Sequence, residues 1–281
     1  MQEILNILRQ AALDFAFQAG ALLGGLSLLA LLLHLLERRI SRRLSHRFGW
    51  RSVLLTGWLG VPVHELSHLI TCRIFAHRVV AYSLFSPDPR TGTLGYVQHG
   101  YSRRNLYQLA GNFFIGIAPL VGGSLLLLGA LWLLLPEARP AFTAPPSPHM
   151  ADQLRHTAAL AGATLQGIFT MDHLASWRLW LFLLLALSVG THMSPSWPDL
   201  EGAWPGLLVL ATLLLALNVT NRALGLYAPD APMAPMASLM APLLGLLLVA
   251  LVLQALFWVM VEIVVHLTSP RRGMRLGYDA R

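Results

Sequence analysis

The stretch VLLTGWLGVPVHELSHLITCRIFA, residues 53–76, sets three ionisable side chains, His64, Glu65 and His68, inside an apolar run. About 20 mostly apolar residues are enough for a helix that crosses a lipid bilayer. Ionisable side chains cost free energy to insert at that depth, so their presence marks a functional site by default. The stretch therefore predicts a membrane helix that carries a polar site.

Five further apolar runs predict more membrane helices. Hydrophobic residues make up 56% of the 281-residue chain and charged residues only 12%, whereas an average soluble domain is about 25% charged. We therefore expect an all-α polytopic membrane protein with about six transmembrane helices, forming one membrane-embedded domain over residues 1–281 with a core at about 53–219. The five further runs lie at about 15–36, 107–135, 176–196, 203–219 and 238–267.

Two connections between these runs are long enough to hold secondary structure of their own. Residues 77–105 hold two β-prone runs, VVAYSLF and TLGYVQH, around the turn sequence SPDPRTG. They predict a small β-hairpin between the second and third helices. Residues 136–175 are rich in proline at their start and predict a surface loop with a helical stretch at about 151–170.

The positive charge of the chain points to a membrane surface. All 20 basic residues are arginine, and with 13 acidic residues they give a net charge of +7. The arginines gather between apolar runs, as at residues 38–51, which is typical of segments beside lipid headgroups. We expect the lipid bilayer as a partner and exclude nucleic acid. The absence of lysine is typical of a GC-rich bacterial genome, so we expect a multi-pass protein of the bacterial inner (cytoplasmic) membrane.

The motif His64-Glu65-Leu66-Ser67-His68 has the spacing of a zinc site. Residues i and i+4 of a helix share a face, so both imidazoles can bind one metal ion. Glu65 is then placed to act as a general base on water. The single cysteine, Cys72, excludes an intrachain disulfide and a thiolate cluster for structural zinc.

A catalytic zinc ion takes three protein ligands and keeps one position open. Our expected third ligand is Asp199, which lies in the Pro- and Gly-rich segment SVGTHMSPSWPDLEGAWPG, residues 188–206. Irregular backbone at membrane depth is tolerated only where it is buried in protein or lines a wet cavity. Cys72 and His192 remain alternative ligands, and His192 also suits a hydrogen bond to a reacting oxyanion or to a neighbouring carbonyl.

Taken together, these residues resemble the site-2 protease family of intramembrane zinc metalloproteases. The resemblance covers about residues 60–199: HELSH in a membrane span, an extended segment, an apolar span, and then an Asp beside a later span. It implies a six-helix type of core, His64 and His68 as ligands and Glu65 as general base. Asp199 would match the Asp of the family motif N-P-x-x-D-G. The match is loose, because Ser194 replaces the Asn and one extra residue precedes Asp199.

The resemblance also suggests a substrate-binding residue and a topology. Gly111-Asn112-Phe113 looks like a shortened form of the family segment G-P-x-x-N-F, which would place Asn112 near the metal, holding the substrate backbone or an oxyanion. A helix cap or an interhelical hydrogen bond is the alternative role for Asn112. We assign His192 to substrate binding as well. The family further implies that both chain termini lie in the cytosol.

The sequence thus predicts a zinc-dependent endopeptidase that hydrolyses peptide bonds in or near transmembrane segments of membrane-protein substrates. An edge strand of the hairpin would hold the unwound substrate. Two alternatives stay open. The chain would be a transporter or channel that uses the His/Glu/Asp cluster as a metal or proton pathway, or a pseudo-protease that binds membrane partners without cutting them.

Overall fold

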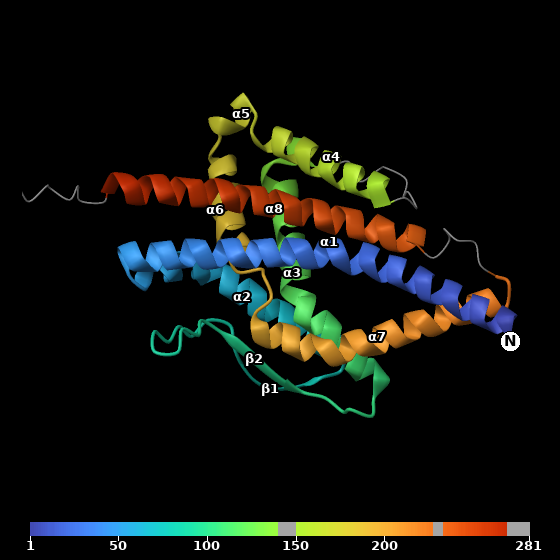
Figure 1. The fold of residues 1–281 in the computed structure, drawn as a ribbon. Coiled ribbons are helices and arrows are strands. Elements are labelled where there is room, and N and C mark those ends of the chain that lie inside the picture. Colours follow the sequence, from blue (N-terminus) through green and yellow to red (C-terminus); the bar gives the residue numbers. More distant parts are fainter. Residues whose placement is uncertain (140–149, 227–232, 269–281) are drawn as a thin grey trace, which may run out of the picture.

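Helices and one two-stranded sheet make up the computed structural model, which describes residues 1–139, 150–226 and 233–268 (Figure 1). The strands β1 (Arg78–Ser83) and β2 (Tyr96–Gly100) follow the second helix. The expected helical fold with a small hairpin is therefore confirmed. The helices are α1 (Gln2–Phe48), α2 (Arg51–Ile74), α3 (Leu106–Leu134), the short 3₁₀ turn η1 (Pro136–Ala138), α4 (Met150–Ile168), α5 (Met171–Leu174), α6 (Trp177–Gly190), α7 (Trp197–Ala223) and α8 (Met233–Thr268).

In the described ranges, four helices are long and apolar enough to cross a membrane: α1, α3, α7 and the Ala241–Thr268 part of α8. The other two expected spans correspond to α2 and α6. Helix α2 carries Arg51, Glu65 and Arg73. Helix α6 has 14 residues, about 21 Å of helix against a hydrocarbon core of about 30 Å. Helix α2 carries the HELSH motif, and α6 ends just before the segment that holds Asp199. Both helices pack on neighbouring helices.

Helices α1 and α8 lie side by side and run in the same direction (Figure 1). Gly25 lies against Leu244, and further along Arg43 forms an ion pair with Glu262 at 2.7 Å. The numbers rise together on both helices, so the pair is parallel. Six complete crossings would make the first and last spans antiparallel and would leave both termini on one side. The parallel arrangement of α1 and α8 therefore does not agree with six complete crossings or with both termini on one side.

Helix boundaries differ from the expected spans at several points. The expected span at 15–36 is the middle of a continuous 47-residue helix, α1. The expected span at 203–219 begins earlier, because Ser196 caps α7. In the proline-rich segment 136–175, residues 140–149 lie outside the described part, and the expected helix is α4. Helix α4 packs along α8, where Leu160 lies against Gly245.

Glycines bring the helices around α3 close together. A Cβ atom at Gly116 of α3 would lie 2.6 Å from the carbonyl oxygen of Asp199, and one at Gly206 of α7 would lie 2.7 Å from the carbonyl oxygen of Leu109. Small residues allow such close backbone approach between apolar helices. The first turn of α7 is thereby held against the middle of α3.

The hairpin lies along α2, outside the helices (Figure 1). Its strands are antiparallel and pair Ser83 with Tyr96 and Arg78 with Gly100, with an irregularity between Val79 and Ala81. Within the described ranges the sheet has two strands, and each has one edge without a neighbouring strand. Such an edge can pair with an extended peptide.

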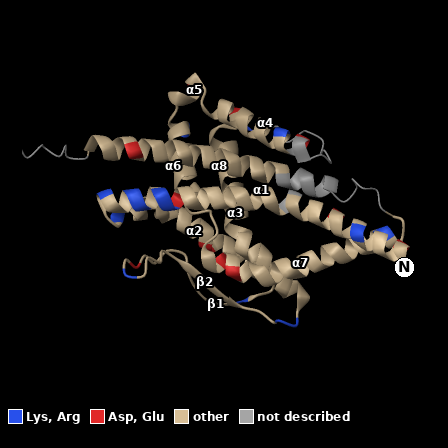
Figure 2. Cartoon of the chain, in the orientation of Figure 1, with Lys and Arg blue, Asp and Glu red and all other residues tan. Residues whose placement is uncertain are grey.

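Charged residues are few and gathered in particular places (Figure 2). Basic residues lie at the C-terminal end of α1, and acidic residues lie where α2 and α7 approach each other. Most of the remaining helical surface carries no charge, as expected for a surface that faces lipid.

Candidate metal centre

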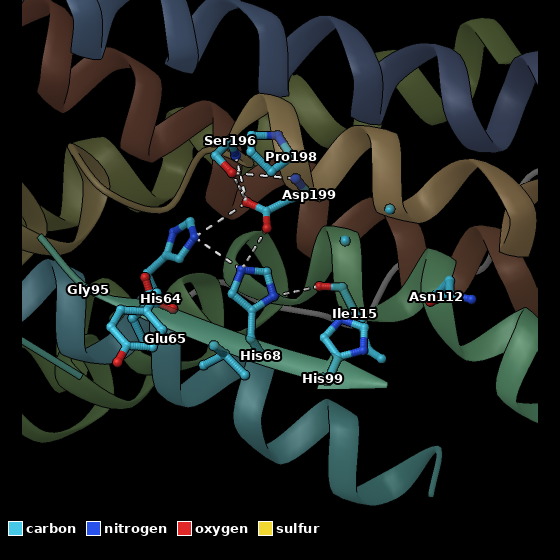
Figure 3. A pocket seen from close by; sticks show the side chains of 14 residues that line it. His64, Glu65, His68, Gly95, His99, Asn112, Ile115, Ser196, Pro198 and Asp199 are labelled. Atoms are coloured by element: carbon cyan, nitrogen blue, oxygen red, sulfur yellow. Dashed lines mark hydrogen bonds and ion pairs between the residues drawn. The ribbon is translucent and has the colours of Figure 1, made fainter. Parts of the chain in front are cut away.

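His64, His68 and Asp199 meet at one point between α2 and α7 (Figure 3). The two Nε2 atoms are 3.1 Å apart. Asp199 Oδ2 lies 3.5 Å from His64 Nε2, and Asp199 Oδ1 lies 3.2 Å from His68 Nε2. Tetrahedral zinc with bonds of about 2.0–2.1 Å sets its ligand atoms about 3.3–3.5 Å apart. The three residues therefore form a triangle in which each measured pair of donor atoms is spaced much as two ligand atoms of one zinc ion are, with His64 and His68 facing different oxygens of Asp199.

Backbone carbonyl groups orient both imidazole rings. His64 Nδ1 lies 2.6 Å from the carbonyl oxygen of His192, and His68 Nδ1 lies 2.9 Å from that of Ile115. A carbonyl oxygen only accepts hydrogen bonds, so each Nδ1 carries the proton. Each Nε2 then presents a lone pair to the other ring and to the Asp199 carboxylate. With both rings neutral, these lone pairs converge as the ligands of one cation do, and imidazoles oriented through the other ring nitrogen are typical of metal ligands.

Asp199 is held by the start of its own helix. Ser196 caps α7, and both its backbone N–H and its hydroxyl donate to Asp199 Oδ2, at 2.7 Å and 2.6 Å. Asp199 Oδ1, the other oxygen, faces His68. The sequence itself indicates this arrangement, because Ser196-Trp197-Pro198-Asp199 is a capping-box pattern with proline in the first turn.

We expect Ser196→Ala to weaken zinc binding by about 10–100-fold, because it removes a hydrogen bond that orients a ligand. The helix cap is lost as well, at about 1 kcal/mol of stability. The matched control is Ser176→Ala, which removes the cap of α6 and touches no candidate ligand. Competition with a chromophoric chelator measures the affinity, and thermal unfolding in detergent measures stability. Equal zinc affinities in the two variants would contradict the role of Ser196.

Glu65 lies in a cavity of about 350 Å³ next to the triangle. The Glu65 side chain is buried, and the cavity is also lined by Gly95, which directly precedes β2, and by the strand residues Tyr96 and Val97. A Cβ atom at Gly95 would lie 2.8 Å from Glu65 Cγ. Because Gly95 has no side chain, there is room for the Glu65 side chain. This position in the cavity agrees with the role of a general base beside the metal centre.

Of the two residues assigned to substrate binding, Asn112 lines this cavity and His192 does not. Asn112 is 3% exposed, and its Nδ2 has no hydrogen-bond partner among the described residues. The His192 ring instead contacts Ser188 O and Thr191 Oγ1, at 3.2 Å and 3.0 Å. The backbone carbonyl of His192, which no side-chain motif can reveal, is the group that reaches His64.

Cys72 does not join His64 and His68. It lies with His77 and His99 in a second group of potential ligands. His99, which also lines the cavity, belongs to no motif that the sequence displays and was not among the expected site residues. Burial, followed by the neighbouring imidazoles of His77 and His68, lowers the pKa of His99 below its ordinary value.

Comparison of the chain with protein-family models, with curated proteins and with solved structures gave no match in any of the three.

Proposed function

We propose that this protein is an intramembrane zinc metalloprotease of the site-2-protease type. The observation that carries the proposal is the triangle of His64, His68 and Asp199 with Glu65 in the adjoining cavity. Two neutral imidazoles and a carboxylate are a donor set found in catalytic zinc sites. The other nitrogen atom of each ring also lies at hydrogen-bond distance from a backbone carbonyl oxygen, an arrangement that orients histidine ligands at metal sites.

In the proposed reaction, Glu65 is the residue that transfers the proton. Zinc, when bound at such a site, supplies Lewis acidity towards a peptide carbonyl and makes water acidic near neutral pH. The Glu65 carboxylate accepts a proton from the attacking water and then delivers it to the nitrogen of the leaving amine. Asn112 lines the same cavity and is the residue that we propose contacts the substrate backbone.

Strand β2 is the element we propose to hold the substrate. A transmembrane helix hides its carbonyls in internal hydrogen bonds, so a scissile segment must first become extended. Strand residues Tyr96 and Val97 line the cavity together with Glu65. An extended segment paired with the free edge of β2 would therefore pass beside the general base.

We also propose that the protein is a multi-pass protein of the bacterial inner membrane, with the lipid bilayer and a transmembrane substrate protein as its partners. His192, after α6, and Asp199, at the start of α7, both contact His64 in the middle of α2. We therefore count the short helix α6 and the long helix α7 as successive parts of one crossing that is interrupted at the site, as in other membrane proteins with broken helices. This gives five crossings by six helices and agrees with the parallel α1 and α8.

Metal removal and restoration test the function. The full chain is reconstituted in liposomes with a library of tagged single-span membrane proteins. We expect cleavage within or beside the span, its loss after treatment with a zinc chelator, and its return when zinc is added back.

The alternatives predict different results in the same liposomes. A transporter would carry zinc or protons to an internal dye without cutting any library member, and a pseudo-protease would bind members without cutting or transport. Either result, obtained with zinc-loaded protein, would contradict the proposed function.

A further inference from the structure

Cys72, His77 and His99 form a second cluster of metal-binding side chains. Their potential ligand atoms all lie within 4.8 Å of one another. Cys72 is fully buried and His77 is 4% exposed, whereas His99 is partly exposed toward the cavity. The three residues come from α2, from the turn after it and from β2, so the cluster joins the hairpin to the helix that carries HELSH.

The His77 ring is fixed in the orientation that a ligand needs. His77 Nε2 lies 2.8 Å from the backbone carbonyl oxygen of Gln108. Because that oxygen only accepts, Nε2 carries the proton and Nδ1 has a free lone pair. This lone pair faces His99 Nδ1, which lies 3.0 Å away. The arrangement repeats, with the two ring nitrogens exchanged, the backbone-anchored imidazoles of His64 and His68.

The turn that presents His77 is unusual and tightly held. Ala76 has a φ of +55°, in the left-handed region that non-glycine residues seldom adopt. The backbone N–H of His77 donates to the Cys72 carbonyl at 2.8 Å, which closes the end of α2 and brings these two residues together. Gln108 Nε2 donates to the Ala76 carbonyl oxygen at 2.7 Å. Gln108 therefore holds both the strained residue and the His77 ring.

The geometry points to a second zinc site, formed by the Cys72 thiolate and the Nδ1 atoms of His77 and His99. One thiolate and two imidazoles suit zinc, and these three ligands leave one position of a tetrahedron for a further group. The bound ion fastens β2 to the end of α2. This site uses none of the residues of the proposed catalytic centre, so the inference does not depend on the proposed function.

Cobalt tests this site without ambiguity, because Cys72 is the only cysteine in the chain. The full chain is purified in detergent under reducing conditions and loaded with Co²⁺. We expect about two metal ions per chain and a near-ultraviolet band from charge transfer between thiolate and cobalt, which a site of two histidines and an aspartate lacks. Cys72→Ser should lose the band and about one metal ion. His173→Gln, which removes an imidazole on α5, is the matched control and should change neither.

Further variants separate this site from the catalytic proposal. His64→Ala should lose one metal ion and keep the full thiolate band. His77→Gln should lose the band and keep cobalt at the site of His64, His68 and Asp199. This variant tests the second site independently if Cys72→Ser fails to fold. A wild-type chain that binds one ion and shows no thiolate band would overturn the inference, since His77 and His99 would then share only a hydrogen bond. A wild-type chain that holds both ions and cleaves no substrate would overturn the proposed function instead.

Discussion

We expect Glu65→Gln to lower peptide-bond cleavage by at least about 10²–10⁴-fold, the usual contribution of a general base. The glutamine side chain has nearly the same shape and fits the space beside Gly95, but it cannot accept the proton from water. Zinc content should stay at the wild-type value, because Glu65 is not part of the ligand triangle. Cleavage of a tagged single-span substrate in liposomes and metal analysis of the same preparation give both results.

The control for this variant is Glu201→Gln. Glu201 is exposed and accepts a hydrogen bond from the Trp197 ring at 2.6 Å, so its substitution should leave cleavage and zinc unchanged. Wild-type turnover in a clean Glu65→Gln preparation would remove Glu65 from the mechanism. Loss of zinc together with activity would show that Glu65 acts on the metal and not on the proton.

The second large effect is expected from the third ligand. Asp199→Ala removes the only carboxylate of the triangle and should release about one zinc ion per chain, as His64→Ala should. Cleavage should disappear with the metal. Metal analysis after dialysis against a weak chelator measures the loss, and added zinc at high concentration should restore part of the activity of Asp199→Ala.

His192→Ala is the informative comparison for Asp199→Ala. The structure uses the backbone carbonyl of His192 and not its ring to orient His64, and alanine keeps that carbonyl. We therefore expect His192→Ala to retain zinc. If it lost zinc while Asp199→Ala retained it, the ring of His192 and not Asp199 would be the third ligand.

Some of the candidate site could be read from the sequence because helix periodicity is local. The spacing of His64 and His68 places both rings on one face whatever the rest of the fold does. Asp199 was harder, because its position depends on the close contact of α7 with α3 at Gly116. Its own segment nevertheless showed the break that admits a polar group at membrane depth.

Other features depend on contacts between distant segments and could not be predicted. The carbonyl groups that orient the rings belong to His192 and Ile115. Every residue has a backbone carbonyl, so the sequence does not indicate which of them contacts a histidine ring. Cys72 and His99 are distant in sequence and meet only because the hairpin folds back along α2. Hydropathy located the apolar runs, but it carries no information on direction, so the parallel α1 and α8 were unexpected.

The contact between Gly95 and Glu65 also limits how the hairpin can vary in evolution. Residues 89–92 form its exposed tip, beyond the bridge between Asp88 and Thr93, so insertions there would change length without moving β2. A slip of one residue in β2 would turn every side chain to the opposite face and would bring a Cβ atom to the place that Gly95 leaves open. The tip can therefore diverge freely between related proteins, while the register of the strand and the position of this glycine must be inherited together.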